Sequence, residues 1–380
     1  MSDAAAAVRS AVGAVVDPEL RRPLSELGML RDITVDGDVA SVGIALTIVG
    51  CPAADRIARD VTDAAASVDG IAHVELALGV MTPDERRELT ELLRDGRAAR
   101  AMPFGPESLT RVIAVTSGKG GVGKSTLTAN LAVALAARGL SVGLIDADVH
   151  GFSIPGLLGL VDAEGRTQRP TRIDALIVPP IAYDVKVVSI GMFLREGEEG
   201  SAVAWRGPML HRTVQQFLTD VFFGDLDILL LDMPPGTGDV AISVGQLLPH
   251  AEVLVVTTPQ AAASDVAIRS GIVARQTGQR VAGVVENMAA FTLPDGTTVD
   301  IFGSGGGMAV ADALSDSGTP VPLLASIPLS PALRADADAG IPVVVAHPED
   351  SAAAAIADLA ANLAVQPRGL AGRSLPLSLR

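Results

Sequence analysis

A glycine-rich stretch between an apolar run and a helical pattern restricts the fold of this chain more than any other feature. The run RVIAVTS at residues 111–117 leads directly into GKGGVGKST at residues 118–126, and helical periodicity begins near Lys124. The stretch matches the pattern G-x-x-x-x-G-K-[ST], which is typical of a phosphate-binding loop between a strand and a helix. Glycines permit positive φ angles and let backbone N–H groups approach phosphate oxygens. The sequence therefore predicts a nucleotide site in an α/β domain.

Each part of this loop has its own expected role. We expect Lys124 to bridge the β and γ phosphates of ATP and the Ser125 hydroxyl to bind Mg²⁺. Only three lysines occur in the chain, at 119, 124 and 186, and two of them fall in this loop. Lysine carries a compact charge on a thin stem, whereas arginine ends in a wide planar fork. The two lysines therefore indicate that this loop needs the thinner side chain. The predicted ATP-binding residues of the loop are Gly118, Lys119, Gly120, Gly121, Val122, Gly123, Lys124, Ser125 and Thr126.

The pattern around this loop extends over residues 109–366. Near-continuous apolar runs alternate there with helical patterns, as expected for a parallel sheet that is covered on both faces. This predicts the α/β class, with a doubly wound, mostly parallel sheet. The runs are RVIAVTS, SVGLIDAD, VKVVSIG, LDILLLDMPP, EVLVVTTP, RVAGVVENM and LLASIP.

The remaining segments predict a second, smaller domain and its connections. Residues 1–81 follow an α-β-β-α-β order, with a hairpin signal at Asp36-Gly37. Residues 82–108 are densely charged at first and predict a linker helix with a solvated face, followed by a loop. Residues 367–380 predict a mobile tail.

Composition excludes several functional classes. A formal charge of −15 and 3% aromatic residues disfavour a nucleic-acid binder. No charge-free apolar run reaches the roughly 18–20 residues of a membrane span, and the N-terminus is a poor secretory signal. With Cys51 as the only cysteine, an intrachain disulfide is impossible. We therefore expect a cytoplasmic protein without membrane or nucleic-acid partners.

The two-lysine loop resembles the deviant Walker A motif of the MinD, ParA and nitrogenase-iron-protein class of P-loop ATPases. That resemblance implies a homodimer in which Lys119 reaches the partner's nucleotide, in the manner of an arginine finger. It also implies that Asp148 orients or deprotonates the attacking water, and that Asp146 is structural or near Mg²⁺. Asp232, at the end of another apolar run, is expected to hold Mg²⁺ through water. Helix capping is the alternative role for such acidic residues.

Longer blocks resemble the Mrp/ApbC family of ATP-dependent iron–sulfur cluster carriers. The blocks DADVHGFSIPGLLG, AWRGPML, LDILLLDMPPGTGD, TTPQ, GVVENM and IFGSGGG occur in the family's order. Residues 1–80, with Asp17-Pro18-Glu19 and the turn around Cys51, resemble the iron–sulfur assembly domain that precedes many members. The resemblance implies adenine contact at Asn287, and it implies assembly and recipient proteins as partners.

One departure from the family pattern concerns the cluster. Members usually have a C-x-x-C pair after ENM, and the pairs of a dimer hold a bridging [4Fe–4S] cluster. Residues 289–296, AAFTLPDG, contain no cysteine, so a dimer offers only the two copies of Cys51. Cys51 is either a small buried apolar residue or a reactive thiol whose pKa is lowered by a following helix. Its role as an iron–sulfur ligand is therefore a hypothesis.

These observations predict an ATPase that hydrolyses ATP slowly and works as an iron–sulfur cluster carrier or assembly factor. Two alternatives stay open at this point. One is a spatial-organising ATPase similar to MinD or ParA, and the other is a nucleotide switch that has lost its cluster.

Overall fold

A computed structural model describes residues 3–94, 102–149, 151–194, 207–293, 295–316 and 318–365. The predicted tail at 367–380 lies outside these residues. Contacts divide the chain into two units. Unit 1 consists of residues 1–101, 170–180 and 220–224, and unit 2 of residues 102–169, 181–219 and 225–380. The predicted domain boundaries at residues 81, 108 and 366 stay a prediction. Two segments from the middle of the chain thus belong to the N-terminal unit.

Unit 1 has the predicted α-β-β-α-β order. Strands β1 and β2 are antiparallel and β3 pairs parallel to β2. The turn between β1 and β2 contains Gly37 at φ +59°, as the Asp-Gly signal predicts. One face of the charged helix α3 is buried, so its surface is not wholly solvated. The elements are α1 Asp3–Gly13, β1 Leu30–Asp36, β2 Val39–Leu46, α2 Ala54–Ala66, β3 His73–Val80 and α3 Pro83–Leu93, with β6 Thr171–Ile173 and β7 Leu176–Val178.

Unit 2 is built around an eight-stranded sheet with the order β15-β12-β11-β4-β10-β5-β9-β8. Every neighbouring pair is parallel except β8 and β9. All seven predicted strands are present, so the predicted fold class is confirmed. The strands are β4 Arg111–Ser117, β5 Val142–Asp146, β8 Ile181–Ala182, β9 Val185–Ser189, β10 Ile228–Asp232, β11 Glu252–Thr257, β12 Arg280–Glu286 and β15 Leu323–Ser326.

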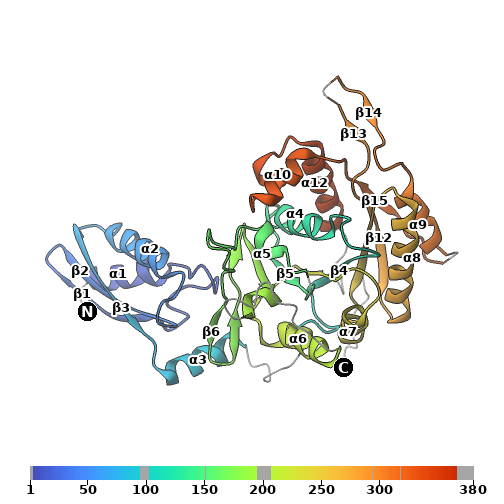
Figure 1. Ribbon diagram of the computed structural model, residues 1–380. Helices are drawn as coiled ribbons and strands as arrows, with labels where there is room; N and C mark the ends of the chain where they lie inside the picture. Colours follow the sequence, from blue (N-terminus) through green and yellow to red (C-terminus); the bar gives the residue numbers. More distant parts are fainter. Residues whose placement is uncertain are drawn as a thin grey trace, which may run out of the picture. The chain divides into compact units, whose positions relative to one another are not determined.

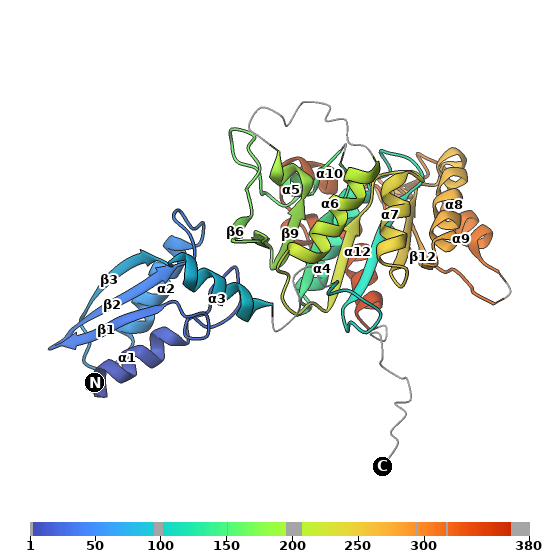
Figure 2. The same cartoon turned by 90° about the horizontal axis from the view of Figure 1, so that it is seen from below.

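Helices cover both faces of this sheet, which explains its continuous apolar strands. Helices α4 and α12 pack together on one face, while α6 and α7 lie side by side on the other (Figures 1 and 2). The central strands β4, β5 and β10 are buried along their whole length. The helices are α4 Lys124–Ala136, α5 Ile154–Leu157, α6 Gly207–Asp220, α7 Asp239–Leu247, α8 Ala261–Gln276, α9 Gly306–Leu314, α10 Pro331–Asp338, α11 Val343–Ala346 and α12 Ser351–Ala364.

A short hairpin extends beyond the sheet of unit 2. Strands β13 Phe291–Thr292 and β14 Thr298–Val299 form it directly after β12 (Figure 1). None of the helices in the described part of the chain combines the length and the apolar character that a membrane span requires.

Candidate nucleotide site

The site lies at the carboxyl ends of three adjacent strands of unit 2. The loop of residues 118–123 follows β4, Asp232 ends β10, and Asp146 ends β5. Because the sheet is parallel, residue 232 is in register with residue 146 on one side and residue 115 on the other. Ligands of open α/β sheets bind at this edge. The sheet therefore brings together residues that are more than a hundred positions apart in the sequence.

The conformation of the loop requires its glycines. Gly121 and Gly123 have φ angles of +80° and +78°, in the left-handed region that side chains disfavour. A Cβ on Gly118 would lie 2.3 Å from the backbone nitrogen of Ala267 in α8, so only glycine fits there. Helix α4 begins at Lys124, and its N-terminus directs backbone N–H groups toward the loop. These features suit a bound phosphate chain.

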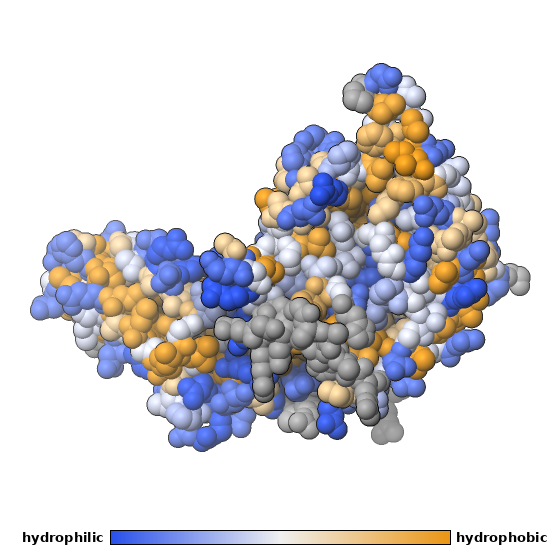
Figure 3. Space-filling model, viewed as in Figure 1, coloured by the Kyte–Doolittle hydropathy of each residue, from blue (hydrophilic) through white to orange (hydrophobic). Residues whose placement is uncertain are grey.

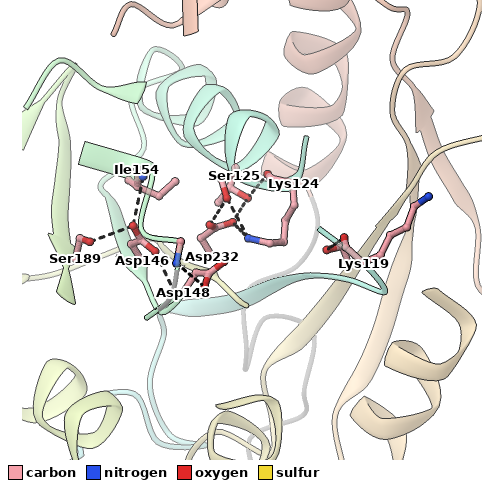
Figure 4. Close-up of polar contacts among 11 residues, drawn as sticks. Lys119, Lys124, Ser125, Asp146, Asp148, Ile154, Ser189 and Asp232 are labelled. Atoms are coloured by element: carbon pink, nitrogen blue, oxygen red, sulfur yellow. Dashed lines mark hydrogen bonds and ion pairs between the residues drawn. The ribbon is translucent and has the colours of Figure 1, made fainter. Parts of the chain in front are cut away.

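Lys124 and Ser125 converge on the carboxylate of Asp232 (Figure 4). Thr128 contacts the same carboxylate. Lys124 Nζ lies 2.7 Å from Asp232 Oδ1. The Ser125 hydroxyl donates to Oδ2 at 2.6 Å, and the Thr128 hydroxyl lies 3.0 Å from Oδ1. Asp232 is fully buried, and burial raises its pKa while Lys124 and the two hydroxyls oppose that rise. Thr128 was not predicted, although it lies one helical turn after Lys124 on the same face of α4.

Asp146 and Asp148 have different surroundings. Asp146 is fully buried and accepts hydrogen bonds from the backbone N–H groups of Asp148 and Ile154 and from the Ser189 hydroxyl, at 3.2, 3.3 and 3.0 Å. Burial, followed by the negative charge of Asp232, raises the pKa of Asp146 well above its ordinary value. Asp148 accepts the Gly151 N–H at 3.2 Å. These contacts fit a structural role for Asp146, whereas Mg²⁺ at Asp146 stays a prediction.

Lys119 and Asn287 contact other parts of the site. Lys119 points away from the Asp232 cluster (Figure 4), and its Nζ donates to Gln260 Oε1 at 3.2 Å. The buried side chain of Asn287 donates a hydrogen bond to the carbonyl oxygen of Val122 at 2.9 Å. This bond ties the phosphate loop to the end of β12. Adenine contact by Asn287 stays a prediction. Neither Gln260 nor this loop contact was apparent from the sequence.

The oxygen ligands present suit Mg²⁺. Ser125 and Asp232 offer a hydroxyl and a carboxylate, and Mg²⁺ commonly combines one or two such protein ligands with water and substrate phosphates. No three His, Cys, Asp or Glu side chains are grouped as a metal site within the described ranges. Ser125 and Asp232 are the residues that would hold a Mg²⁺ bound together with a nucleotide.

The segment after β12 differs from a cluster-binding loop. Residues 289–296 contain no cysteine, and the hairpin there presents partly exposed apolar side chains (Figure 3). Leu293, Val299 and Ile301 are exposed by 37%, 39% and 52%. Thiolate ligands for a cluster are therefore absent from this segment.

Cys51 lies in unit 1 and is only 6% exposed. Its thiol contacts Glu19 Oε2 at 3.7 Å. Burial raises the pKa of Cys51 to about 11; the Ala53 N–H opposes this, but Glu19 and Asp17 add to it. The alternative in which the following helix lowers the pKa is therefore wrong, because burial and two carboxyl groups outweigh the helix N-terminus.

The fold and the two-lysine loop define a P-loop NTPase of the deviant Walker A class. Residues 108–364 match the family described as the NUBPL iron-transfer P-loop NTPase, and residues 5–76 match the family of iron–sulfur cluster assembly proteins. The chain belongs to the Mrp/ApbC family of these NTPases, with an iron–sulfur assembly domain in front, so the predicted family is confirmed.

Similar proteins cover nearly the whole chain. An iron–sulfur cluster carrier protein of Mycobacterium tuberculosis is 55% identical over 379 residues, covering 99% of this chain and 97% of that protein. One of Deinococcus radiodurans is 41% identical and covers 95% of both chains. A nucleotide-binding protein of Archaeoglobus fulgidus, solved in complex with ADP, is 35% identical at a TM-score of 0.50. The match covers 62% of this chain and 92% of the archaeal one.

Proposed function

We propose that this protein binds Mg-ATP at residues 118–126, hydrolyses it slowly as a homodimer with two ATP molecules between the subunits, and acts in iron–sulfur cluster assembly or transfer. The convergence of Lys124, Ser125 and Thr128 on Asp232 is the observation that supports nucleotide binding most directly. The role in iron–sulfur cluster assembly or transfer is supported by relatives that match over nearly the full length and are named iron–sulfur cluster carrier proteins.

Each residue has a defined task in this proposal. Lys124 binds the β and γ phosphates, while Ser125 and Asp232 hold Mg²⁺, which supplies positive charge to the phosphates when it is bound. Asp148 accepts the proton of the attacking water or orients it. The Lys119 side chain leaves Gln260 and stabilises charge on the phosphoryl group bound to the second subunit. The output of hydrolysis is a conformational change.

In this proposal the cluster is the cargo, and the protein's own residues supply only some of its ligands. A [4Fe–4S] cluster normally takes four thiolates, whereas a dimer of this chain has only two cysteines. We therefore propose that any cluster takes further ligands from glutathione, a carboxylate or an assembly or recipient protein. The exposed Cys-free hairpin does not supply them.

Two measurements test this function. Phosphate release should be abolished in Lys124→Ala, and unchanged turnover would end the ATPase proposal. Anaerobic reconstitution with iron and sulfide should give a brown protein with visible absorption, and Cys51→Ser should diminish it. Wild type that stays colourless in the presence of glutathione would contradict the cargo role.

A second function is favoured by the loss of cysteine between residues 289 and 296. The protein would then keep its nucleotide cycle as a regulatory switch and bind no cluster. Normal ATP turnover together with a colourless reconstituted protein would support this alternative.

A further inference from the structure

A hairpin from the middle of the chain completes the hydrophobic core of unit 1. The chain leaves unit 2 after Arg169, forms β6 and β7, and returns to unit 2 at Ile181. Ile173, Leu176 and Val178 of this hairpin are 1%, 4% and 1% exposed, and they belong to the same apolar cluster as Cys51. We call residues 170–180 the strap. Without the strap, the apolar side of unit 1 that it covers would face water.

The strap also contacts the surroundings of Cys51 through polar groups. The Thr171 hydroxyl donates to Glu19 Oε1 at 3.1 Å, and the other oxygen of the same carboxylate accepts from the Cys51 thiol at 3.7 Å. Glu19 itself is held in a turn in which Asp17 Oδ1 accepts its N–H at 2.9 Å. A single carboxylate therefore connects the strap to the only thiol of the protein.

The ends of the segment that contains the strap lie at the nucleotide site. Asp146 ends β5 and Ser189 ends β9, and the two residues are register partners in the sheet. The Ser189 hydroxyl donates to Asp146 Oδ2 at 3.0 Å, and the same oxygen accepts the Ile154 N–H. Asp146 thus joins the two ends of the segment 146–189, and the strap is part of this segment of the sequence.

We propose that the strap covers the Cys51 thiol and that Mg-ATP binding at the phosphate loop loosens it. This linkage rests on the proposed function. Lys124 and Ser125 are paired with Asp232 here, and on binding Mg-ATP they would turn to the phosphates and the metal, which would change the charges around buried Asp146. The bonds from Asp146 to Ser189 and Ile154 respond first, and the strap follows because residues 146–189, the segment that contains it, are joined there. The Cys51 thiol is then more accessible to reagents when Mg-ATP is bound than when the site is empty.

The labelling rate of the sole cysteine tests the covering role. Purified full-length protein is treated with a maleimide, and the modified fraction is followed by mass spectrometry. Thr171→Val removes one hydroxyl at nearly constant volume and should speed labelling about fivefold. Ile173→Ala removes buried contact area and should speed it roughly thirtyfold. Thr34→Val, at an exposed position of β1, is the matched control and should label at the wild-type rate.

Urea unfolding of the same variants separates strap opening from global unfolding. Faster labelling should persist under conditions in which every variant is fully folded. Wild-type labelling rates in both strap variants would overturn the covering role, and so would rates that merely follow global stability.

The nucleotide linkage is tested in parallel by adding Mg-ATP to the labelling reaction. Binding of a fluorescent ATP analogue is measured on the same protein samples. Mg-ATP should speed wild-type labelling severalfold, and Ser189→Ala should reduce that effect while binding persists. Binding without any change in labelling would overturn the linkage. Failure to bind the ATP analogue would instead overturn the proposed function. The covering role would then be decided by the labelling rates of the Thr171→Val and Ile173→Ala variants alone.

Discussion

Lys124 and Asp232 form a buried ion pair at the centre of the nucleotide site, with 2.7 Å between Nζ and Oδ1. Their side chains are exposed by only 6% and 0%. Removing one member of such a pair leaves an uncompensated charge and costs more than the pair contributes. We therefore expect Lys124 to affect both ATP turnover and stability, and each must be measured separately.

Lys124→Ala should abolish measurable ATP turnover and lower the free energy of unfolding by about 3–5 kcal/mol. The loss of stability arises because Asp232 stays buried without its cation. Phosphate release and urea unfolding check the two effects. Lys119→Ala is the matched control, because its half-exposed side chain should leave stability unchanged within about 0.5 kcal/mol. A stable Lys124→Ala protein would show that the ion pair is not formed in solution.

Lys119→Ala should bind ATP normally but hydrolyse it at least about a hundredfold more slowly, because its proposed action is on the partner's nucleotide. An equal mixture of Lys119→Ala and Lys124→Ala subunits should recover about a quarter of wild-type turnover, since half of the dimers contain one complete site. Phosphate release before and after subunit exchange measures this. An inactive mixture, with mixed dimers demonstrated, would refute action across the dimer.

Asp148→Asn should slow hydrolysis roughly 10²–10⁴-fold while nucleotide binding stays within a few fold. The amide retains an oxygen that accepts the Gly151 N–H, so the loop conformation should persist. Single-turnover hydrolysis and equilibrium binding of ATP separate the two effects. Equal loss of binding and turnover would assign Asp148 a structural role instead.

Asp146→Asn should flatten the pH dependence of stability. Since the pKa of Asp146 is raised in the folded protein, the folded state holds a proton that the unfolded state has lost above about pH 4. The contribution of Asp146 to the free energy of unfolding therefore falls as pH rises above about pH 4, by up to about 1.4 kcal/mol per pH unit. Urea unfolding at pH 5 and pH 8 should show a smaller fall in the variant. The exposed Asp63→Asn should behave as wild type, and identical slopes for all three proteins would contradict a buried proton.

Alkylation of Cys51 by iodoacetamide should increase with pH up to about pH 11, where the buried thiol ionises. At pH 7.5 the folded protein should react roughly a hundredfold more slowly than the urea-unfolded chain, because the thiolate is the reactive form. Rates across pH 7–10.5 for folded and unfolded protein check this. A plateau near pH 8.5 in the folded protein would show that burial does not control the thiol.

The sequence predicts the part of the site that is local in the chain. Glycines at 121 and 123 and the lysine at 124 determine one strand–loop–helix unit, and apolar runs mark each strand of the parallel sheet. Asp232 was also predictable, because it ends such a run. The contact between Asn287 and Val122 was not, since its members are 165 positions apart and no local pattern relates them.

The sequence by itself therefore determined the fold class, the phosphate loop and the family, because backbone conformation and hydrophobic periodicity depend on neighbouring residues. The tertiary structure decided which distant groups meet. It placed Thr128 on Asp232 and Ser189 on Asp146, it turned Lys119 toward Gln260, and it brought residues 170–180 into unit 1 beside Glu19. It also raised the pKa of Cys51, because burial and the charges that surround a thiol are properties of the packed molecule.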